Sequence, residues 1–124
     1  MPEAELQKFY QAYLSSVLAT LEDDHGPDSE VEIDQDSIPA QTRRQMLADC
    51  EQFLNENRTD IKRNIRSAGY DFWLSRNGIG EGFLDPEQES VYGHLQARRL
   101  DVAAKEFGPF SILIDDSADK PPTK

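Results

Sequence analysis

The groups best suited to chemistry in this sequence stand close together in one stretch. They are a carboxylate, an indole, a hydroxyl, a guanidinium and an amide: Asp71, Trp73, Ser75, Arg76 and Asn77. Such groups can bind a ligand, and an indole can stack on a nucleotide base. Ser75 has no histidine near it in the sequence, so a nucleophile with a neighbouring general base is not indicated. The alternative is that these side chains make hydrogen bonds which only fix the local backbone.

A row of carboxylates near residue 30 is a second candidate site, for binding a partner. Its members alternate along the chain: Asp28, Glu30, Glu32, Asp34 and Asp36. In an extended segment this spacing places all five on one face, about 6.7 Å apart. Carboxylates can replace phosphates against a basic surface, although a DNA strand carries a phosphate every ~3.4 Å, so a close mimic needs a second row. The alternative is a solvated loop or edge strand whose charge prevents strand pairing.

The remaining reactive groups do not form a recognisable site. His25 and His94 are isolated, and Cys50 falls on the predicted buried stripe of a helix, where it packs as a small thiol. The glycines between residues 78 and 82 are not followed by the Gly-Lys-Ser/Thr of a phosphate-binding loop. The sequence therefore predicts no catalytic residue, no metal and no cofactor, and a protein that is not an enzyme.

Composition limits the partners. The chain has 124 residues, with 24 acidic and 13 basic side chains and a net charge of -11. This charge disfavours binding to duplex nucleic acid or to an anionic membrane surface. No apolar run approaches the ~20 residues of a membrane span. A single cysteine is typical of a reducing compartment, so we expect a cytoplasmic protein.

The N-terminal half has helical hydrophobic spacing. It predicts a first helix from Pro2 to the breaker at residues 25–27, with its aromatic residues in the core. A second helix is expected to open at residues 37–39, and Thr59 to cap a short third helix that ends at Gly69. This third helix has a basic face that could pair with the acidic row of the same molecule: Arg58, Lys62, Arg63 and Arg66.

A β-hairpin is expected next. Asn77-Gly78 lies between two aromatic-rich runs, and a type I′ turn needs positive φ at both of its central residues. In the resulting register, Trp73 lies opposite Gly82 and covers the gap left by a residue without a side chain. Gly80 and Gly82 indicate close packing, a bulge or room for a ligand.

The last part of the sequence completes the predicted fold. Asp85 and Pro86 mark the start of a helix that ends at Gly108, and residues 110–114 are expected to form a final strand. The predicted fold class is α+β, with N-terminal helices followed by a β-hairpin, a helix and a final strand in a small antiparallel sheet. Residues 1–116 are expected to form a single acidic domain, and residues 117–124 a mobile polar tail.

The motif DFWLSRNGxGxGF at residues 71–83 resembles a family of small, largely uncharacterised proteins encoded by bacteriophages, prophages and related mobile elements. The likeness extends from about residue 9 to residue 116. It implies a bacterial host cell as the setting and does not imply a reaction. Tyr70 and Ile79 stand where many relatives carry histidine, and Leu84 stands where tryptophan is usual.

Two functional hypotheses follow. In the first, the chain is a non-enzymatic accessory or counter-defence protein that uses the acidic row to bind a host or phage protein with a basic surface, such as a nucleic-acid-processing protein. In the second, the aromatic hairpin binds a nucleotide or a single strand, with Phe72 and Trp73 as the stacking platform and with Arg76 and Asn77 reading the ligand. A structural phage protein is a further alternative.

Overall fold

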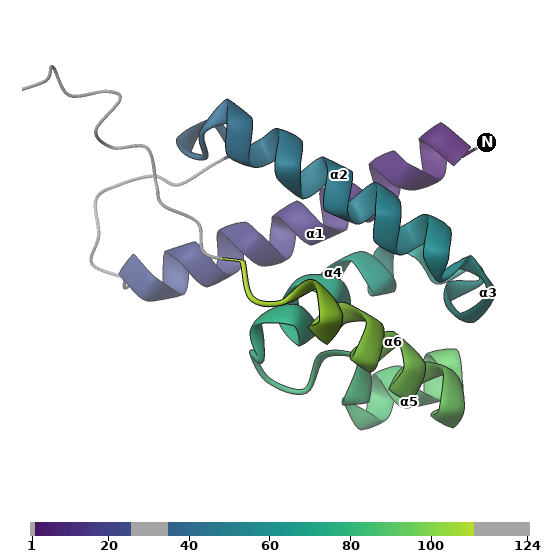
Figure 1. Ribbon diagram of the computed structural model, residues 1–124. Coiled ribbons are helices and arrows are strands. Elements are labelled where there is room, and N and C mark those ends of the chain that lie inside the picture. The colour runs from purple at the N-terminus through teal and green to yellow at the C-terminus, as the bar shows by residue number, and fades with distance from the viewer. Residues whose placement is uncertain (1, 26–34, 111–124) are drawn as a thin grey trace, which may run out of the picture.

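The computed structural model describes residues 2–25 and 35–110, and it places them in helices joined by short turns (Figure 1). Six α-helices and two short 3₁₀ helices occupy these ranges: α1 (Pro2–His25), η1 (Gln35–Ser37), α2 (Ala40–Glu56), α3 (Arg58–Ile61), α4 (Ile65–Asn77), η2 (Gly82–Leu84), α5 (Pro86–Tyr92) and α6 (His94–Phe107). The same ranges contain no strand. The predicted α+β fold is therefore wrong, and the fold is helical.

The predicted hairpin is wrong because its first run is the C-terminal half of α4. The buried residues of α4 recur at helical spacing: Ile65, Ala68, Gly69, Phe72, Trp73, Ser75 and Arg76. Gly78 adopts the left-handed conformation with φ 66°, and the Ile79 N–H donates to the Leu74 carbonyl at 2.9 Å. This is a helix C-terminal motif, which requires a positive φ just as a type I′ turn does. Asn-Gly therefore marks the end of a helix here.

The predicted third helix is also divided differently. Thr59 does not cap it, because α3 already begins at Arg58 and is a single turn that stops where Lys62 takes φ 57°. Gly69 does not end a helix but lies inside α4, where a Cβ atom would overlap the backbone carbonyl of Phe9 on α1. The absence of a side chain at Gly69 lets the two helices approach closely.

The predicted helix after residue 85 is confirmed at its start and divided further on. Asp85 caps α5, because its Oδ1 accepts a hydrogen bond from the Glu87 N–H at 2.9 Å, and Pro86 occupies the first turn. Gly93, with φ 106°, separates α5 from α6. Phe110 lies outside any helix or strand; the rest of the predicted final strand and the predicted tail lie outside the described residues.

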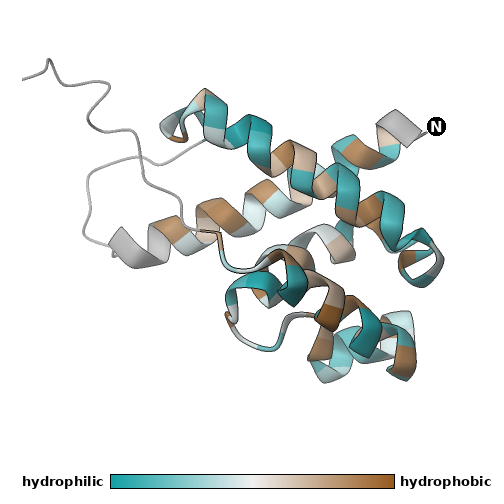
Figure 2. Cartoon of the chain, viewed as in Figure 1, coloured by the Kyte–Doolittle hydropathy of each residue, from teal (hydrophilic) through white to brown (hydrophobic). Residues whose placement is uncertain are grey.

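The first two predicted helices are confirmed as α1 and α2, and their apolar stripes form the core with α4. Five aromatic residues of this core have no exposed surface: Phe9, Tyr13, Phe53, Phe72 and Phe83. The Phe53 and Phe72 rings stack with centroids 4.2 Å apart. In Figure 2 hydrophobic residues recur along α1 and α2 and alternate with hydrophilic ones.

Helix α4 occupies the centre of the fold. It packs most extensively against α1 and also contacts α6 and η2, while α2 covers another side of α1 (Figure 1). None of the helices within the described ranges combines the length and the apolar character needed to cross a membrane.

We expect Gly69→Ala to destabilise the protein by ~1–3 kcal/mol, because its methyl group would push α1 away from α4. Alanine has the higher helix propensity, so a loss of stability would show that interhelical packing outweighs the local gain. Urea unfolding followed by circular dichroism measures the difference. Ser67→Ala on the same helix is the control; equal stability of the two variants would contradict the close approach.

Candidate functional site

The five residues proposed from the sequence all lie on α4, but they do not converge on one site. Asp71 and Ser75 are four residues apart and bond to α5 and η2, while Trp73 and Arg76 bond toward α1 and α2. The side chains of all but Asn77 are buried, with 3–5% of each residue exposed. The predicted cluster is therefore two sets of contacts on different sides of one helix.

The Arg76 guanidinium is bonded to three separate parts of the chain. Its Nη1 donates to Asp49 Oδ2 on α2 at 3.1 Å and to the Tyr13 hydroxyl on α1 at 3.2 Å. Its Nε donates to the Gly108 carbonyl at 2.9 Å, and Nη2 donates to the Phe107 carbonyl at 3.4 Å. The Arg76 side chain is 3% exposed and that of Asp49 is 13% exposed, so this ion pair is largely shielded from water.

Aromatic rings enclose the same guanidinium. The Arg76 Cζ atom lies 5.1–5.5 Å from the centroids of three rings: Phe72, Phe107 and Phe110. A cation over aromatic faces is stabilised by their quadrupoles, and the effect grows when water is excluded. Arg76 therefore holds helices together and is not placed to read a nucleotide.

Trp73 and Asn77 are also used within the fold. The Trp73 Nε1–H donates to Thr20 Oγ1 on α1 at 3.0 Å, and the indole meets the Tyr13 ring edge-on at 5.5 Å. The Asn77 Nδ2 donates to the Trp73 carbonyl, while its Oδ1 accepts from the Phe110 N–H at 2.8 Å. Because Phe72 is fully buried and Trp73 is 3% exposed, neither ring offers a stacking surface.

Asp71 and Ser75 attach η2 and α5 to α4. Asp71 Oδ2 accepts hydrogen bonds from Gln88 Nε2 at 2.8 Å and from the Tyr92 hydroxyl at 2.9 Å. Ser75 Oγ accepts from the Phe83 N–H at 3.0 Å, under Gly82, where any Cβ would overlap that hydroxyl. The close packing expected at this glycine is thus observed.

The pKa of Asp71 is raised from 3.8 to about 6. Burial is the main cause, because it penalises the ionised carboxylate; the hydrogen bonds from Tyr92 and Gln88 favour that form and reduce the shift, and the nearby charge of Asp85 adds to it. A carboxyl group that titrates near neutral pH beside a pocket is a candidate for binding or proton transfer.

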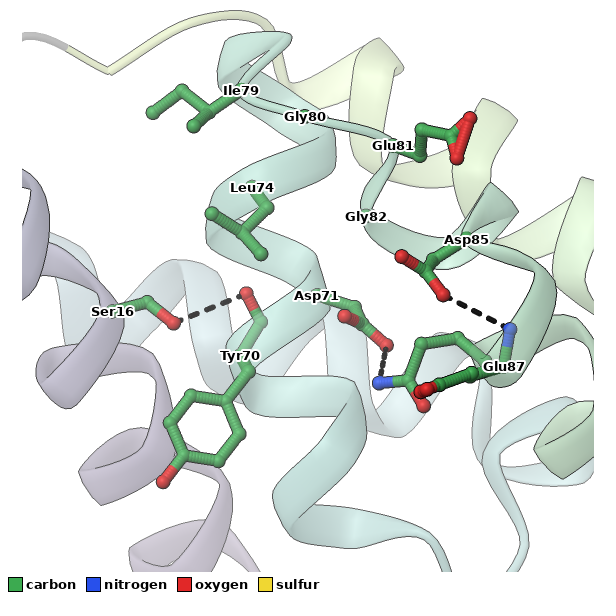
Figure 3. A pocket seen from close by; sticks show the side chains of 11 residues that line it. Ser16, Tyr70, Asp71, Leu74, Ile79, Gly80, Glu81, Gly82, Asp85 and Glu87 are labelled. Atoms are coloured by element: carbon green, nitrogen blue, oxygen red, sulfur yellow. Dashed lines mark hydrogen bonds between the residues drawn. The ribbon is translucent and has the colours of Figure 1, made fainter.

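That pocket opens over α4 between α1 and the η2–α5 segment and has a volume of about 640 Å³ (Figure 3). Its lining includes four carboxylates and no lysine or arginine: Asp71, Glu81, Asp85 and Glu87. Leu74 and Ile79 form an apolar part of the lining, to the upper left of Asp71 and Asp85 in Figure 3. We refer to this pocket as the acidic hollow.

Sequence reasoning identified only part of the acidic hollow. Asp71, Gly80 and Gly82 were marked by type and spacing, but the contributions of Ser16 on α1 and Glu87 on α5 depend on tertiary packing. Tyr70 and Ile79 also line this pocket; the sequence had marked them only as positions that differ from the family it resembles.

Two further kinds of candidate remain, the Cys50 thiol and possible metal ligands. Cys50 is fully buried, and burial raises the pKa of its thiol well above the usual value, so the predicted packing role is confirmed and a thiolate is disfavoured. Among the residues that the structure describes, no group of three or more His, Cys, Asp or Glu side chains is arranged to hold a metal ion.

The acidic row falls mostly outside the described residues. Of its five members only Asp36 is described, exposed on η1. Arg58 of the predicted basic face pairs with Glu5 on α1. Lys62, Arg63 and Arg66 are exposed, and in the described part of the chain no ion pair engages them, so their pairing with the row stays a prediction.

No protein-family model, curated protein or solved structure matches this chain.

Replacing Arg76 by methionine should destabilise the fold by about 3–5 kcal/mol, because it leaves the Asp49 carboxylate and two backbone carbonyls without their donor. Arg76→Lys should also destabilise, since an ammonium cannot reproduce the guanidinium fork. Chemical denaturation measures both changes. The control is Arg98→Met on the exposed side of α6, expected to change stability by less than about 0.5 kcal/mol. A small effect at Arg76 would show that the ion pair is not a structural centre.

Asp71 should make stability depend on pH. Its folded pKa of about 6 lies above the ordinary 3.8, so the native state binds the proton more tightly. Its contribution is fully present below about pH 4, is lost as pH rises through 6, and amounts to roughly 2–3 kcal/mol. Asp71→Asn keeps an oxygen that accepts from Gln88 and Tyr92 but removes the titration.

The measurement is the unfolding free energy of the wild type and of Asp71→Asn between pH 4 and pH 8. We expect the variant to gain stability relative to the wild type as pH increases through this window. Glu51→Gln, at an exposed position of α2, is the control. Parallel pH profiles for the wild type and Asp71→Asn would contradict the raised pKa.

Proposed function

We propose that this chain is a non-enzymatic accessory or counter-defence protein of a phage or mobile element, and that it binds a basic host nucleic-acid-processing protein through the acidic row at residues 28–36. The observation that carries the proposal is the charge. The net charge is -11, and the stretch from residue 22 to residue 36 contains eight carboxylates and no lysine or arginine. Such a stretch is complementary to surfaces that bind phosphates.

The contacts of α4 support recognition by charge over recognition by aromatic stacking. The proposed stacking residues Phe72 and Trp73 are buried, and Arg76 and Asn77 are bonded to carbonyl, carboxylate and backbone groups inside the protein. We therefore do not propose nucleotide binding by these four residues. Asp36, the described member of the acidic row, is exposed beside the start of α2.

A row of carboxylates would act in two ways on a basic partner. Its field speeds the encounter, because opposite charges steer diffusion and the effect declines as salt rises. Once bound, carboxylates at the centre of the contact form charge-assisted hydrogen bonds with lysine and arginine, while pairs at the rim contribute little. Central members of the row should therefore matter most.

The test reverses the charge of the three central residues, in the variant Glu30→Lys/Glu32→Lys/Asp34→Lys. Its matched control is Glu51→Lys/Glu56→Lys/Glu106→Lys, at three exposed positions on α2 and α6. Both variants carry a net charge of -5, since each of three reversals adds two to -11. A difference in affinity between the two variants therefore depends on where the charges lie and not on the net charge.

A tagged wild-type protein first captures partners from bacterial lysate with and without nuclease treatment, and a protein that is retained after treatment is then purified for titration. We expect the row variant to bind at least about tenfold more weakly and with a shallower salt dependence, and the control to retain most of the affinity. Equal affinity and equal salt dependence for the two variants, or capture only of nuclease-sensitive proteins, would refute the proposal.

A further inference from the structure

Two hollows of opposite charge lie next to each other where α1 meets α4. One is the acidic hollow. The other, which we call the basic hollow, has a volume of about 330 Å³, and its lining includes Lys8, Gln11 and Arg66 but no carboxylate. Tyr70 lines both hollows. The seam between the two helices is therefore basic on one side of Tyr70 and acidic on the other.

The order of the two hollows along α4 follows from helix geometry. Arg66, Tyr70 and Leu74 are spaced by four residues, so they follow one another along one face at about one-turn intervals. Arg66 belongs to the basic hollow, and Leu74 belongs to the acidic hollow. The basic hollow therefore lies toward the N-terminal end of α4 and the acidic hollow toward its C-terminal end.

Two charged side chains of each hollow lie at the surface. Lys8 and Arg66 are exposed, as are Glu81 and Glu87. Within the described ranges, none of these four side chains takes part in an ion pair, although other charges such as Arg99 and Asp60 do pair. Among the described residues, two cations without an ion-pair partner thus lie on one side of Tyr70 and two such anions on the other.

Apolar surface lies between the charges. Tyr70 is 43% exposed and Ile79 is 36% exposed, which places both among the exposed large hydrophobic residues of the described chain. The backbone under Tyr70 is fixed, because its carbonyl accepts a hydrogen bond from Ser16 Oγ on α1 at 3.3 Å. An apolar centre with a charged rim is the usual anatomy of a protein–protein interface.

We propose that this seam is a self-association surface and that its occupant is a second copy of the same chain, related by a two-fold axis near Tyr70. When this axis lies in the contact plane and is perpendicular to α4, the rotation reverses the direction of the helix, so it brings the basic hollow of each copy over the acidic hollow of the other. Lys8 and Arg66 of each copy then face Glu81 and Glu87 of the other copy, and the two Tyr70 side chains pack at the centre. The surface is complementary to itself because its charges change sign across Tyr70.

The net charge determines how this association must be measured. Two copies with a charge of -11 each repel one another at long range, and salt weakens both that repulsion and the local ion pairs. A salt series alone therefore cannot identify the surface. Mixing two variants with complementary charge reversals at constant salt separates the effect of the local ion pairs from the effect of the net charge.

The experiment uses two charge-reversed variants, Lys8→Glu/Arg66→Glu and Glu81→Lys/Glu87→Lys, in analytical ultracentrifugation over a wide range of protein concentration. We expect the wild type to form a reversible dimer and each variant alone to associate at least about tenfold more weakly. An equimolar mixture of the two should recover a dimer, because the glutamates introduced in one copy then face the lysines introduced in the other, while the unchanged Lys8 and Arg66 face the unchanged Glu81 and Glu87.

Arg44→Glu/Arg98→Glu is the matched control for the first variant, since it makes the same change in net charge at exposed positions of α2 and α6 that line neither hollow. This control should dimerise more strongly than Lys8→Glu/Arg66→Glu. A wild type that remains monomeric at every concentration, an equal loss in the control, or a mixture that does not recover the dimer would each overturn the proposal. None of these outcomes depends on binding through residues 28–36, so the two proposals fail separately.

Discussion

The buried guanidinium of Arg76 is the interaction on which the arrangement of the helices depends. It joins α4 to Asp49 on α2, to Tyr13 on α1 and to the chain after α6 through the Gly108 carbonyl. A charge in such surroundings is tolerated only when its donors are satisfied, so each partner must lie within a narrow range of positions. Apolar packing alone would allow these helices to slide, whereas the directional hydrogen bonds select one arrangement.

Helix α4 therefore has two different roles on its two sides. One side carries Phe72, Trp73 and Arg76 into the aromatic core, and the other uses Asp71 and Ser75 to hold η2 and α5. The acidic hollow exists because the second set of bonds folds the segment after Gly78 back beside the helix. Of the residues that the sequence marks as a reactive cluster, Asp71 lines this pocket. Four of the side chains that line it are carboxylates.

We propose charge as the property by which this fold recognises other molecules. The described surface separates the signs along the α1–α4 seam, with Lys8 and Arg66 on one side of Tyr70 and Glu81 and Glu87 on the other. In the sequence, the acidic row adds a further concentration of negative charge between the residues of α1 and those of α2. The two proposals therefore assign to one chain a surface that is complementary to itself and a segment that is complementary to a basic protein.

The sequence by itself determined the features that depend on neighbours within a few residues: the amphipathic α1 and α2, the Asp85 cap of α5, and the burial of Cys50. It did not decide between a hairpin and a helix at Asn77-Gly78, because a positive φ serves a type I′ turn and a helix end equally well. Only the tertiary structure decided this, by burying Phe72 and Trp73 against α1 and α2 at helical spacing. It also gave Arg76 its role, because its partners lie 27 to 63 residues away and no local pattern specifies contacts at such separations.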